Sequence, residues 1–566
     1  MYSTRPAEDD PGSAYRELYV VSTETSEIRP FITGDISVSS IRWSPDGSYI
    51  AFRDKRGDNT FTQVWAIPFA GGEARQLTHA ESSVLLYRWH PDSRHIAYVA
   101  ESPKTEREEA LEDKGYDFIY FEENLKDRNL YLFDVDTEET RKLTEGVSVW
   151  DFQFNHAGTQ IAAAASPLNL VDHRYMFKKI YLVDVARGDM RQLTDNHGKL
   201  DNFAFSPDDA KLVYNAALER KDHAGSQAFV IDAQGGEPVN LTPENFRGHI
   251  EWVGWHDNKR VLYRASEGVW KTLNTVPVDG GEREVIYDAQ ETKIVIERMA
   301  HTPDAEHFAF YGSSATVPGE VFYWQPGEAL QQLTNHNPWI AERKLGSQEV
   351  ILYKARDGQE IEGLLIYPVD YQAGQQYPLV VNVHGGPEAH FSNSWTRTTR
   401  YSIAGQVLAG SGYAVFYPNY RASTGYGVEF AAAGYQDAAG VEFDDIADGI
   451  DYLVDQGIAD PDRVGLGGGS YGGFASAWFA SYYTDKVRAV CMFVGISNLI
   501  SKRSTTDIPY EEMYVHSGRP LEEMWEFSLK RSPIYYAHQS KTAVLIAGGA
   551  DRSEEHTSEL QSLLII

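Results

Sequence analysis

The stretch GLGGGSYGGF at residues 465–474 decides the fold of the second half of the chain, because it places Ser470 inside a G-x-S-x-G frame. The residues before this stretch predict an apolar strand, and those after it predict a helix. A serine at such a sharp turn needs glycines two positions before and after, and Gly468 and Gly472 meet that need. A glycine-rich turn with an incidental serine is the alternative. The sequence predicts a nucleophile elbow with Ser470 as the nucleophile.

The rest of the second half alternates predicted strands and helices from about residue 345 onward. This pattern indicates a mostly parallel sheet covered by helices on both faces. The alternation begins with a hairpin whose turn is Asp357-Gly358. A later amphipathic helix carries three apolar residues on one face, as a helix packed on a sheet requires: Ile446, Ile450 and Leu453. The order of elements is typical of an α/β-hydrolase.

Acyl transfer at Ser470 requires N–H donors for the developing oxyanion. The backbone N–H of Tyr471, directly after the nucleophile, is the first predicted donor. The second is expected from the loop His384-Gly385-Gly386-Pro387, because glycine permits close backbone approach. Gly385 and Gly386 are therefore the other oxyanion-hole candidates.

The acid and base of a catalytic triad are expected after Ser470 in this fold. Asp551, at the end of an apolar strand, is the candidate acid. Only His556 follows it, in a polar tail that resembles the translation of a sequencing adapter. We therefore expect residues 552–566 to be non-native and the catalytic histidine to be missing from the chain. Three histidines precede the acid and are interpreted as loop or packing residues: His384, His516 and His538.

The first 340 residues contain an internal repeat. One half of the repeat is a strand, a polar turn and a short strand ending in Leu-Thr; the other half leads into an aromatic-x-Pro-Asp turn. Thr78, Thr144, Thr194 and Thr242 are separated by 66, 50 and 48 residues, which suits a four-stranded propeller blade. Five Leu-Thr copies and two weaker copies, seven in all, predict a seven-bladed β-propeller, or eight blades if part of one is missing. The predicted domains are 1–344 (propeller), 345–551 (hydrolase) and 552–566 (tail).

Two further segments carry candidate substrate-binding residues. An insertion after residue 100 begins with a charged stretch that predicts a short exposed helix, and insertions in repeat arrays often map to a binding face. It contains Glu122 and Glu123, which either hold a substrate α-ammonium or are solvated, the more common state of glutamate. The segment from Asn419 to Gly427 is expected to be a rim loop, whose Tyr426 either lines a substrate pocket or packs.

Composition excludes several classes of partner. The formal net charge of −31 argues against nucleic acid and anionic membranes. No run of 18 apolar residues occurs, and the start of the chain lacks the features of a secretory signal. We expect a cytoplasmic location, or a periplasmic or secreted one if the N-terminus is incomplete. The sequence predicts no cofactor and no metal, and it leaves the oligomeric state open.

A repeat with W-S-P-D-G turns, followed by HGGP, NYRASTGYG and GGSYGG, resembles the prolyl oligopeptidase family of serine peptidases over about residues 15–551. The acylaminoacyl-peptidase-like and dipeptidyl-peptidase-like branches are nearest. The resemblance implies that Ser470 is the nucleophile, Asp551 the acid, and Tyr471 N–H with the Gly385 region the oxyanion hole. It also implies that the propeller restricts substrates to short peptides. Dipeptidyl peptidases hold the substrate's free N-terminus with a glutamate pair, so the resemblance strengthens this role for Glu122 and Glu123 but leaves their solvated alternative open.

Two other functions fit the same sequence. The hydrolase machinery is also that of a carboxylesterase acting on small acyl esters. The propeller is also compatible with a binding module attached to a degenerate, non-catalytic hydrolase. For the chain as printed we expect no peptidase activity, because the base is missing.

Overall fold

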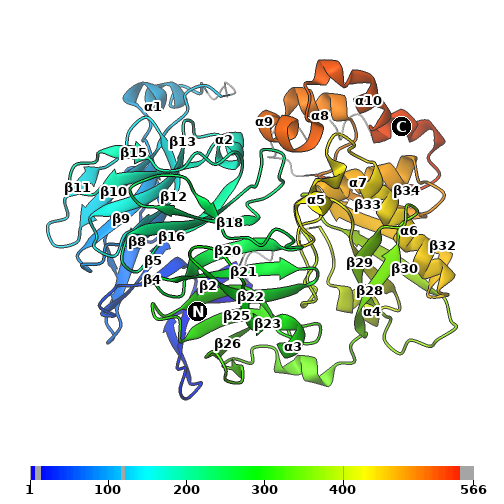
Figure 1. The fold of residues 1–566 in the computed structure, drawn as a ribbon, viewed down its shortest axis with the longest axis horizontal. Helices are drawn as coiled ribbons and strands as arrows, with labels where there is room; N and C mark the ends of the chain where they lie inside the picture. Colours follow the sequence, from blue (N-terminus) through cyan, green and yellow to red (C-terminus); the bar gives the residue numbers. More distant parts are fainter. Residues whose placement is uncertain (1, 7–13, 117–121, 400, 549–566) are drawn as a thin grey trace. The chain divides into compact units, whose positions relative to one another are not determined.

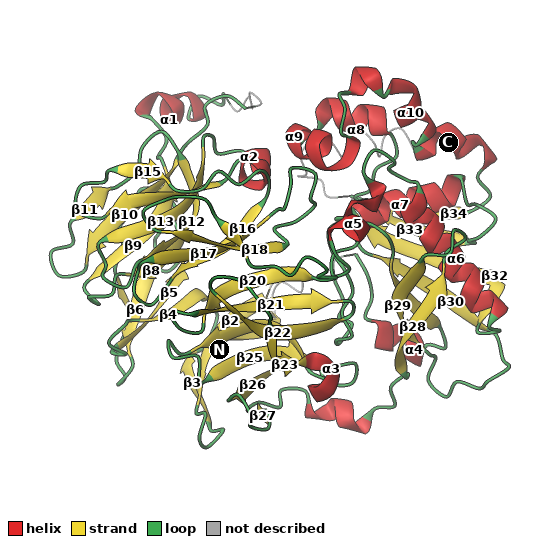
Figure 2. Cartoon of the chain, viewed as in Figure 1, coloured by secondary structure: helices red, strands yellow, loops and turns green. Residues whose placement is uncertain are grey.

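The computed structural model describes residues 2–6, 14–116, 122–399 and 401–548 (Figure 1). In these residues the first part of the chain forms six four-stranded antiparallel sheets and one three-stranded sheet, and the second part forms one seven-stranded sheet with helices (Figure 2). The chain divides into two compact units with these residues: Met1–Asn196, Ala204–Val213 and Ile231–Pro238 in the first, and His197–Phe203, Tyr214–Val230 and Val239–Ile566 in the second.

The six four-stranded sheets are the blades of a β-propeller, and each takes its strands in chain order. Their strands are β4 (Ser39–Trp43), β5 (Tyr49–Asp54), β6 (Gln63–Pro68) and β7 (Arg75–Gln76); β8 (Val84–Trp89), β9 (His95–Glu101), β10 (Arg128–Asp134) and β11 (Thr140–Lys142); β12 (Ser148–Phe154), β13 (Gln160–Ser166), β14 (Lys179–Asp184) and β15 (Met190–Gln192); β16 (Leu200–Phe205), β17 (Lys211–Ala216), β18 (Gln227–Asp232) and β19 (Val239–Asn240); β20 (His249–Trp255), β21 (Arg260–Glu267), β22 (Trp270–Pro277) and β23 (Glu284–Asp288); β24 (Val295–His301), β25 (Phe308–Ser313), β26 (Glu320–Trp324) and β27 (Gln331–Gln332).

The Leu-Thr signature of the repeat has a physical role in the five blades that carry it. The leucine is buried, and the threonine hydroxyl accepts the backbone N–H of the neighbouring strand, as Thr194 Oγ1 does from Ile180 N at 2.9 Å. The same 2.9 Å bond recurs at Thr78, Thr144, Thr242 and Thr334. The repeat therefore marks the place where a buried N–H at the blade edge needs an acceptor that the short outer strand does not supply.

The prediction of seven or eight blades is wrong, because the described residues form six. The first Leu-Thr-like copy, near residues 18–33, has no aromatic-x-Pro-Asp half before it. Its strands instead form a three-stranded sheet: β1 (Tyr2–Pro6), β2 (Ala14–Val21) and β3 (Ile28–Ile32). A complete blade needs both halves of the repeat, and six such pairs occur in the sequence.

Short helices lie between the propeller strands: α1 (Glu106–Glu112), α2 (Val171–Met176) and α3 (Ala289–Thr292). The 3₁₀ turn η1 (Pro338–Glu342) lies between β27 and the first strand of the second part. The predicted exposed helix of the insertion is confirmed as α1, which begins with a capping box between Thr105 and Glu108 and buries no residue. Among the described residues, no helix combines the length and the apolar character needed to cross a membrane.

The seven-stranded sheet has the order β28-β29-β31-β30-β32-β33-β34. Its strands are β28 (Gln348–Lys354), β29 (Glu360–Ile366), β30 (Tyr377–Val383), β31 (Ala414–Asn419), β32 (Ala459–Gly469), β33 (Ala489–Phe493) and β34 (Ala543–Ala547). The predicted hairpin is confirmed, since β28 pairs antiparallel with β29; β31, β30, β32, β33 and β34 are parallel to one another. This is the predicted hydrolase sheet. The predicted domain boundary at residue 345 lies between β27 and β28 and stays a prediction.

Helices accompany this sheet, and two of them shape its core. The helices are α4 (Gly405–Gly410), α5 (Val428–Ala431), η2 (Ala432–Gly434), α6 (Val441–Asp455), α7 (Tyr471–Ser481), α8 (Leu499–Thr505), α9 (Pro509–Glu511), η3 (Glu512–Ser517), η4 (Leu521–Glu523), α10 (Trp525–Lys530) and η5 (Pro533–Gln539). Helix α6 packs on β28 and β32, and α7 packs on β32 and β33. The predicted apolar face of α6 is confirmed: Ile446, Ile450 and Leu453 are buried, each contributing about 1.5–3 kcal/mol.

Candidate active site

The predicted elbow is present between β32 and α7. Ser470 adopts φ 58° and ψ −118°, a left-handed conformation that costs a non-glycine residue energy and is typical of strained functional turns. Its N–H donates to the carbonyl of Phe493 at 3.1 Å, which holds the turn against β33. A methyl group added at Gly468 or Gly472 would lie 2.3 or 2.2 Å from the carbonyl oxygen of Val383. The two glycines are therefore required by the close approach of β30.

Tyr471 is the first residue of α7, so its N–H has no acceptor within the helix. Every residue of α7 is buried, which places the helix N-terminus inside the domain rather than in water. The backbone N–H groups of this first turn and the positive end of the helix dipole therefore lie beside Ser470. This arrangement favours a negative charge that develops next to the serine.

The structure brings the HGGP loop against the elbow. A methyl group added at Gly385 would lie 2.7 Å from the Gly469 oxygen, 3.2 Å from Ser470 Cβ and 3.5 Å from Tyr471 N. The backbone at Gly385 thus approaches the elbow as closely as only glycine allows. Gly386 serves the turn itself, because its φ of +123° and its contact with Glu388 N exclude a side chain.

His384 holds this loop in shape and is not free to act as a base. Its Nδ1 donates to the carbonyl of Gly385 at 3.0 Å, and its Nε2 accepts from Ser423 Oγ at 2.9 Å. The imidazole ring stacks on Tyr420 with ring centroids 4.4 Å apart. Burial lowers the pKa of His384 to about 4, so the ring is neutral near pH 7. The interpretation of His384 as a loop-shaping residue is confirmed.

A buried carboxyl group anchors the side chain of Tyr471, and the sequence did not predict it. The Tyr471 hydroxyl donates to Glu442 Oε1 at 2.8 Å. Glu442 also accepts the backbone N–H groups of Ala439 at 2.5 Å and Gly440 at 3.0 Å. Its side chain is 0% exposed, and burial raises its pKa to about 7. The one available signal was an acidic residue on the apolar face at the start of a sheet-packing helix.

Tyr426 is engaged within the protein. Its hydroxyl donates to Glu362 Oε2 at 2.7 Å and accepts from Asn419 Nδ2 at 2.8 Å. Glu362 also accepts the N–H of Val269 at 2.9 Å, so the hydroxyl belongs to a network that fixes the rim loop. These contacts match the packing alternative for Tyr426, and a substrate-binding role for it stays a prediction.

The other predicted site residues lie outside the described residues or in the other compact unit. Asp551 lies outside the described residues, as does His556. Glu122 and Glu123 are exposed and belong to the first compact unit, whereas Ser470 belongs to the second. Among the residues that the structure describes, no side chain is hydrogen-bonded to the Ser470 hydroxyl.

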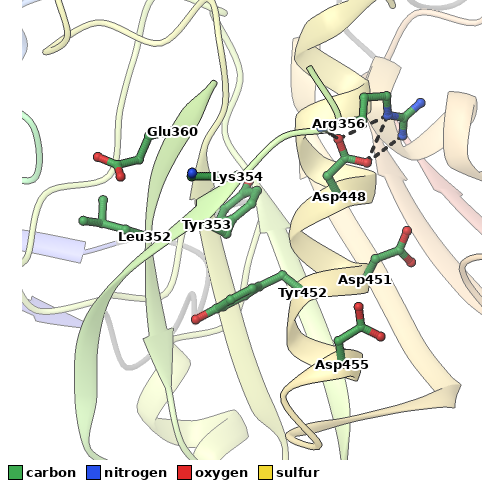
Figure 3. Close-up of a pocket in the computed structure, with 9 residues that line it drawn as sticks. All are labelled: Leu352, Tyr353, Lys354, Arg356, Glu360, Asp448, Asp451, Tyr452 and Asp455. Carbon is green, nitrogen blue, oxygen red and sulfur yellow. Dashed lines mark hydrogen bonds and ion pairs between the residues drawn. The ribbon is translucent and has the colours of Figure 1, made fainter. Parts of the chain in front are cut away.

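A cavity of about 510 Å³ lies elsewhere on the hydrolase sheet and shares no residue with the elbow (Figure 3). It opens between β28, β29 and α6, and Arg356 closes one side through its ion pair with Asp448 at 2.8 Å. Its lining residues are Leu352, Tyr353, Lys354, Arg356, Glu360, Asp448, Asp451, Tyr452 and Asp455. None of the predicted site residues lines this cavity.

Comparisons with known proteins cover both halves of the chain. Residues 399–557 match the family described as "Prolyl oligopeptidase family". An uncharacterized peptidase of Bacillus subtilis, YuxL, is 28% identical and aligns with 94% of this chain and 84% of its own length. Dipeptidyl aminopeptidase BIII of Pseudoxanthomonas mexicana is 33% identical over 42% of this chain and 36% of its own length.

The fold is also that of a solved enzyme. The acylaminoacyl peptidase of Pyrococcus horikoshii superposes with a TM-score of 0.78 at 22% identity, covering 99% of this chain and 87% of that one. The matched family region contains the elbow at Ser470, and the alignment with YuxL covers propeller and hydrolase together. Residues 399–557, which contain the elbow, match the prolyl oligopeptidase family of serine peptidases, and the relatives that align with the chain are named peptidases.

Proposed function

We propose that the protein hydrolyses short peptides through an acyl-enzyme formed on Ser470. The observation that carries this proposal is the strained serine at the elbow with the Gly385 backbone packed against it. The Ser470 oxygen attacks the scissile carbonyl carbon while a histidine base removes the hydroxyl proton. The carbonyl oxygen becomes an oxyanion that the N–H of Tyr471 and the backbone of Gly385 and Gly386 stabilise.

Collapse of this tetrahedral intermediate breaks the peptide C–N bond, and the histidine returns its proton to the leaving amine. Water then attacks the acyl-serine by the same route and restores the hydroxyl. We assign the orientation of the histidine to Asp551, which follows β34 in sequence as the acid of this fold does. For the 566-residue polypeptide as printed we propose no measurable turnover, because no described histidine is hydrogen-bonded to the Ser470 hydroxyl.

Relatives support short peptides as the substrate class. One is named a dipeptidyl aminopeptidase and several are named acylamino-acid-releasing enzymes. One solved acylaminoacyl peptidase is described in complex with Z-Gly-Gly-Phe-chloromethyl ketone. We propose that this protein likewise accepts the end of a short peptide, with Glu122 and Glu123 as the candidate pair for a free N-terminus and Tyr426 as a candidate wall of the pocket.

The test uses an extended protein, in which residues 1–551 are followed by the segment of the Bacillus subtilis relative that comes after its corresponding position. This protein is expected to hydrolyse peptide p-nitroanilides, and Ser470→Ala is expected to lower the rate by at least about 10⁴-fold. Turnover of aryl esters without turnover of peptide amides would show that the protein is an esterase and not a peptidase. Absence of turnover on both, in a protein with a native circular dichroism spectrum, would favour the non-catalytic binding module.

A further inference from the structure

A cluster of metal-ligating side chains lies in the second compact unit, next to the HGGP loop. Glu388, Glu511 and His516 each present one ligand atom, and these atoms all lie within 4.8 Å of one another. Glu388 lies two residues after Gly386, Glu511 is the last residue of α9, and His516 belongs to η3. Three separate segments of the chain therefore converge on one point.

A fourth side chain points into the same cluster and lacks a hydrogen-bond partner. His223, in the same compact unit, is 1% exposed, and neither of its ring nitrogens is hydrogen-bonded to any described residue. Its Nδ1 lies 3.7 Å from Glu388 Oε2, an oxygen that is likewise buried without a hydrogen bond among those residues. Its ring meets that of His516 at a centroid distance of 5.4 Å. Buried polar atoms without partners are rare and require an explanation.

The separation between His223 and Glu388 fits two ligands of one cation. At 3.7 Å the nitrogen and oxygen are too far apart for a hydrogen bond. Zinc binds imidazole nitrogen at about 2.0–2.1 Å and carboxylate oxygen at about 2.0–2.2 Å. Two such ligands lie roughly 3.3–3.7 Å apart at tetrahedral or somewhat wider angles. A cation between them would satisfy both unpartnered atoms.

We propose that this cluster binds one divalent transition-metal cation of the Zn²⁺ class, through a carboxylate oxygen from each of Glu388 and Glu511 and a ring nitrogen from each of His516 and His223. Two imidazoles and two carboxylates form a four-ligand set that suits Zn²⁺, whereas Ca²⁺ and Mg²⁺ prefer oxygen ligands alone. This site departs from the sequence-based expectation of no metal. Because Glu388 follows the HGGP loop, a bound cation would tie that loop to α9, η3 and the His223 segment.

The ammonium group of Lys199 competes with the cation for the carboxylates of Glu388 and Glu511. Its ammonium donates to Glu388 Oε1 at 2.8 Å and also to Glu511 Oε1. The Glu388 oxygen that faces His223 is the other one, Oε2, so Lys199 leaves it available. A positive charge at this distance nevertheless repels a divalent cation. Removing the ammonium while keeping the side-chain length, as in Lys199→Met, is therefore expected to tighten binding of the cation.

The experiment is a titration of the 566-residue chain, without a histidine tag, with Zn²⁺ by calorimetry and with Co²⁺ by visible absorption. A second, partly exposed cluster in the first unit, His90, Asp92 and His95, is removed beforehand by His95→Gln. In this background we expect one ion per chain with a tetrahedral Co²⁺ spectrum. His516→Gln or His223→Gln should weaken binding by at least about tenfold, and Lys199→Met should tighten it roughly tenfold. His538→Gln, at an exposed histidine, is the matched control and should change nothing.

Absence of Zn²⁺ binding in the His95→Gln background, or equal affinity in the parent, the His516→Gln and the His223→Gln proteins, would overturn the site. If one histidine variant loses its native circular dichroism spectrum, the Zn²⁺ affinity of the other variant tests the site. If both do, the Co²⁺ spectrum of the parent decides: a tetrahedral spectrum supports the site, and an octahedral one overturns it. None of these readouts requires catalysis, so the outcome is independent of the proposed peptidase activity.

Discussion

The propeller and the hydrolase domain depend on different kinds of contact, repeated and local in the first and unique and long-range in the second. Five of the six propeller blades repeat one local device, a threonine hydroxyl that accepts a backbone N–H 13 or 14 residues away. The hydrolase site depends on contacts that occur once and join distant segments, such as Gly385 against the elbow at Ser470. A change in the first region should therefore cost a small, local amount of stability. A change in the second should alter chemistry even when it is only one methyl group.

Gly385→Ala is the substitution expected to have the largest effect. The added methyl group would meet the Gly469 oxygen at 2.7 Å and Ser470 Cβ at 3.2 Å, which would displace the loop that we propose supplies an oxyanion donor. In the extended protein we expect kcat on peptide p-nitroanilides to fall about 10²–10³-fold, as for loss of one donor. Gly410→Ala is the matched control, because no atom lies within 4 Å of a methyl group there. An unchanged kcat for Gly385→Ala would show that the loop at Gly385 does not contribute to catalysis.

Glu442→Gln tests the buried carboxyl group that anchors Tyr471 through its effect on stability against pH. Burial raises the pKa of Glu442 from its ordinary value of 4.5 to about 7. Between these values the folded protein keeps a proton that the unfolded chain loses, so stability falls as pH rises from about 4.5 to 7. The shift corresponds to about 3 kcal/mol, a loss that the glutamine variant should not show. Urea midpoints of both proteins at pH 5 and pH 8 measure it, and equal pH dependence would contradict the assignment.

Thr194→Val tests the repeated device of the propeller and should have the smallest effect. The valine keeps the shape of threonine but leaves the buried N–H of Ile180 without its 2.9 Å acceptor. We expect a loss of about 1–3 kcal/mol in stability and no change in kcat of the extended protein. Thr137→Val, at an exposed turn, should stay within about 0.5 kcal/mol of the parent. The thermal unfolding midpoints of the two variants are measured side by side. Equal midpoints would contradict the structural role that we assign to the threonine of the Leu-Thr signature.

The sequence predicted features that depend on neighbours in the chain. The elbow at Ser470 was predictable because strand, glycines and helix are contiguous, and the blades were predictable because each half-repeat is local. The number of blades was wrong because a lone Leu-Thr half was counted as a blade, although the first copy completes only a three-stranded sheet. Counting paired halves instead of single copies gives six.

The remaining site residues were not predictable from the sequence because their partners lie far along the chain. Glu442 contacts Tyr471 across 29 residues, and Lys199 contacts Glu388 across 189. In the sequence each of these residues is an ordinary charged side chain. Their roles follow only from burial and from the fold that brings their partners together.

The most direct measurement of the central claim is covalent labelling of the extended protein with a fluorophosphonate probe, read by intact-mass and peptide mass spectrometry. An activated serine at the elbow predicts one adduct per chain, located on Ser470 and absent from Ser470→Ala. Labelling that persists in Ser470→Ala, or no labelling of a folded protein, would contradict the account.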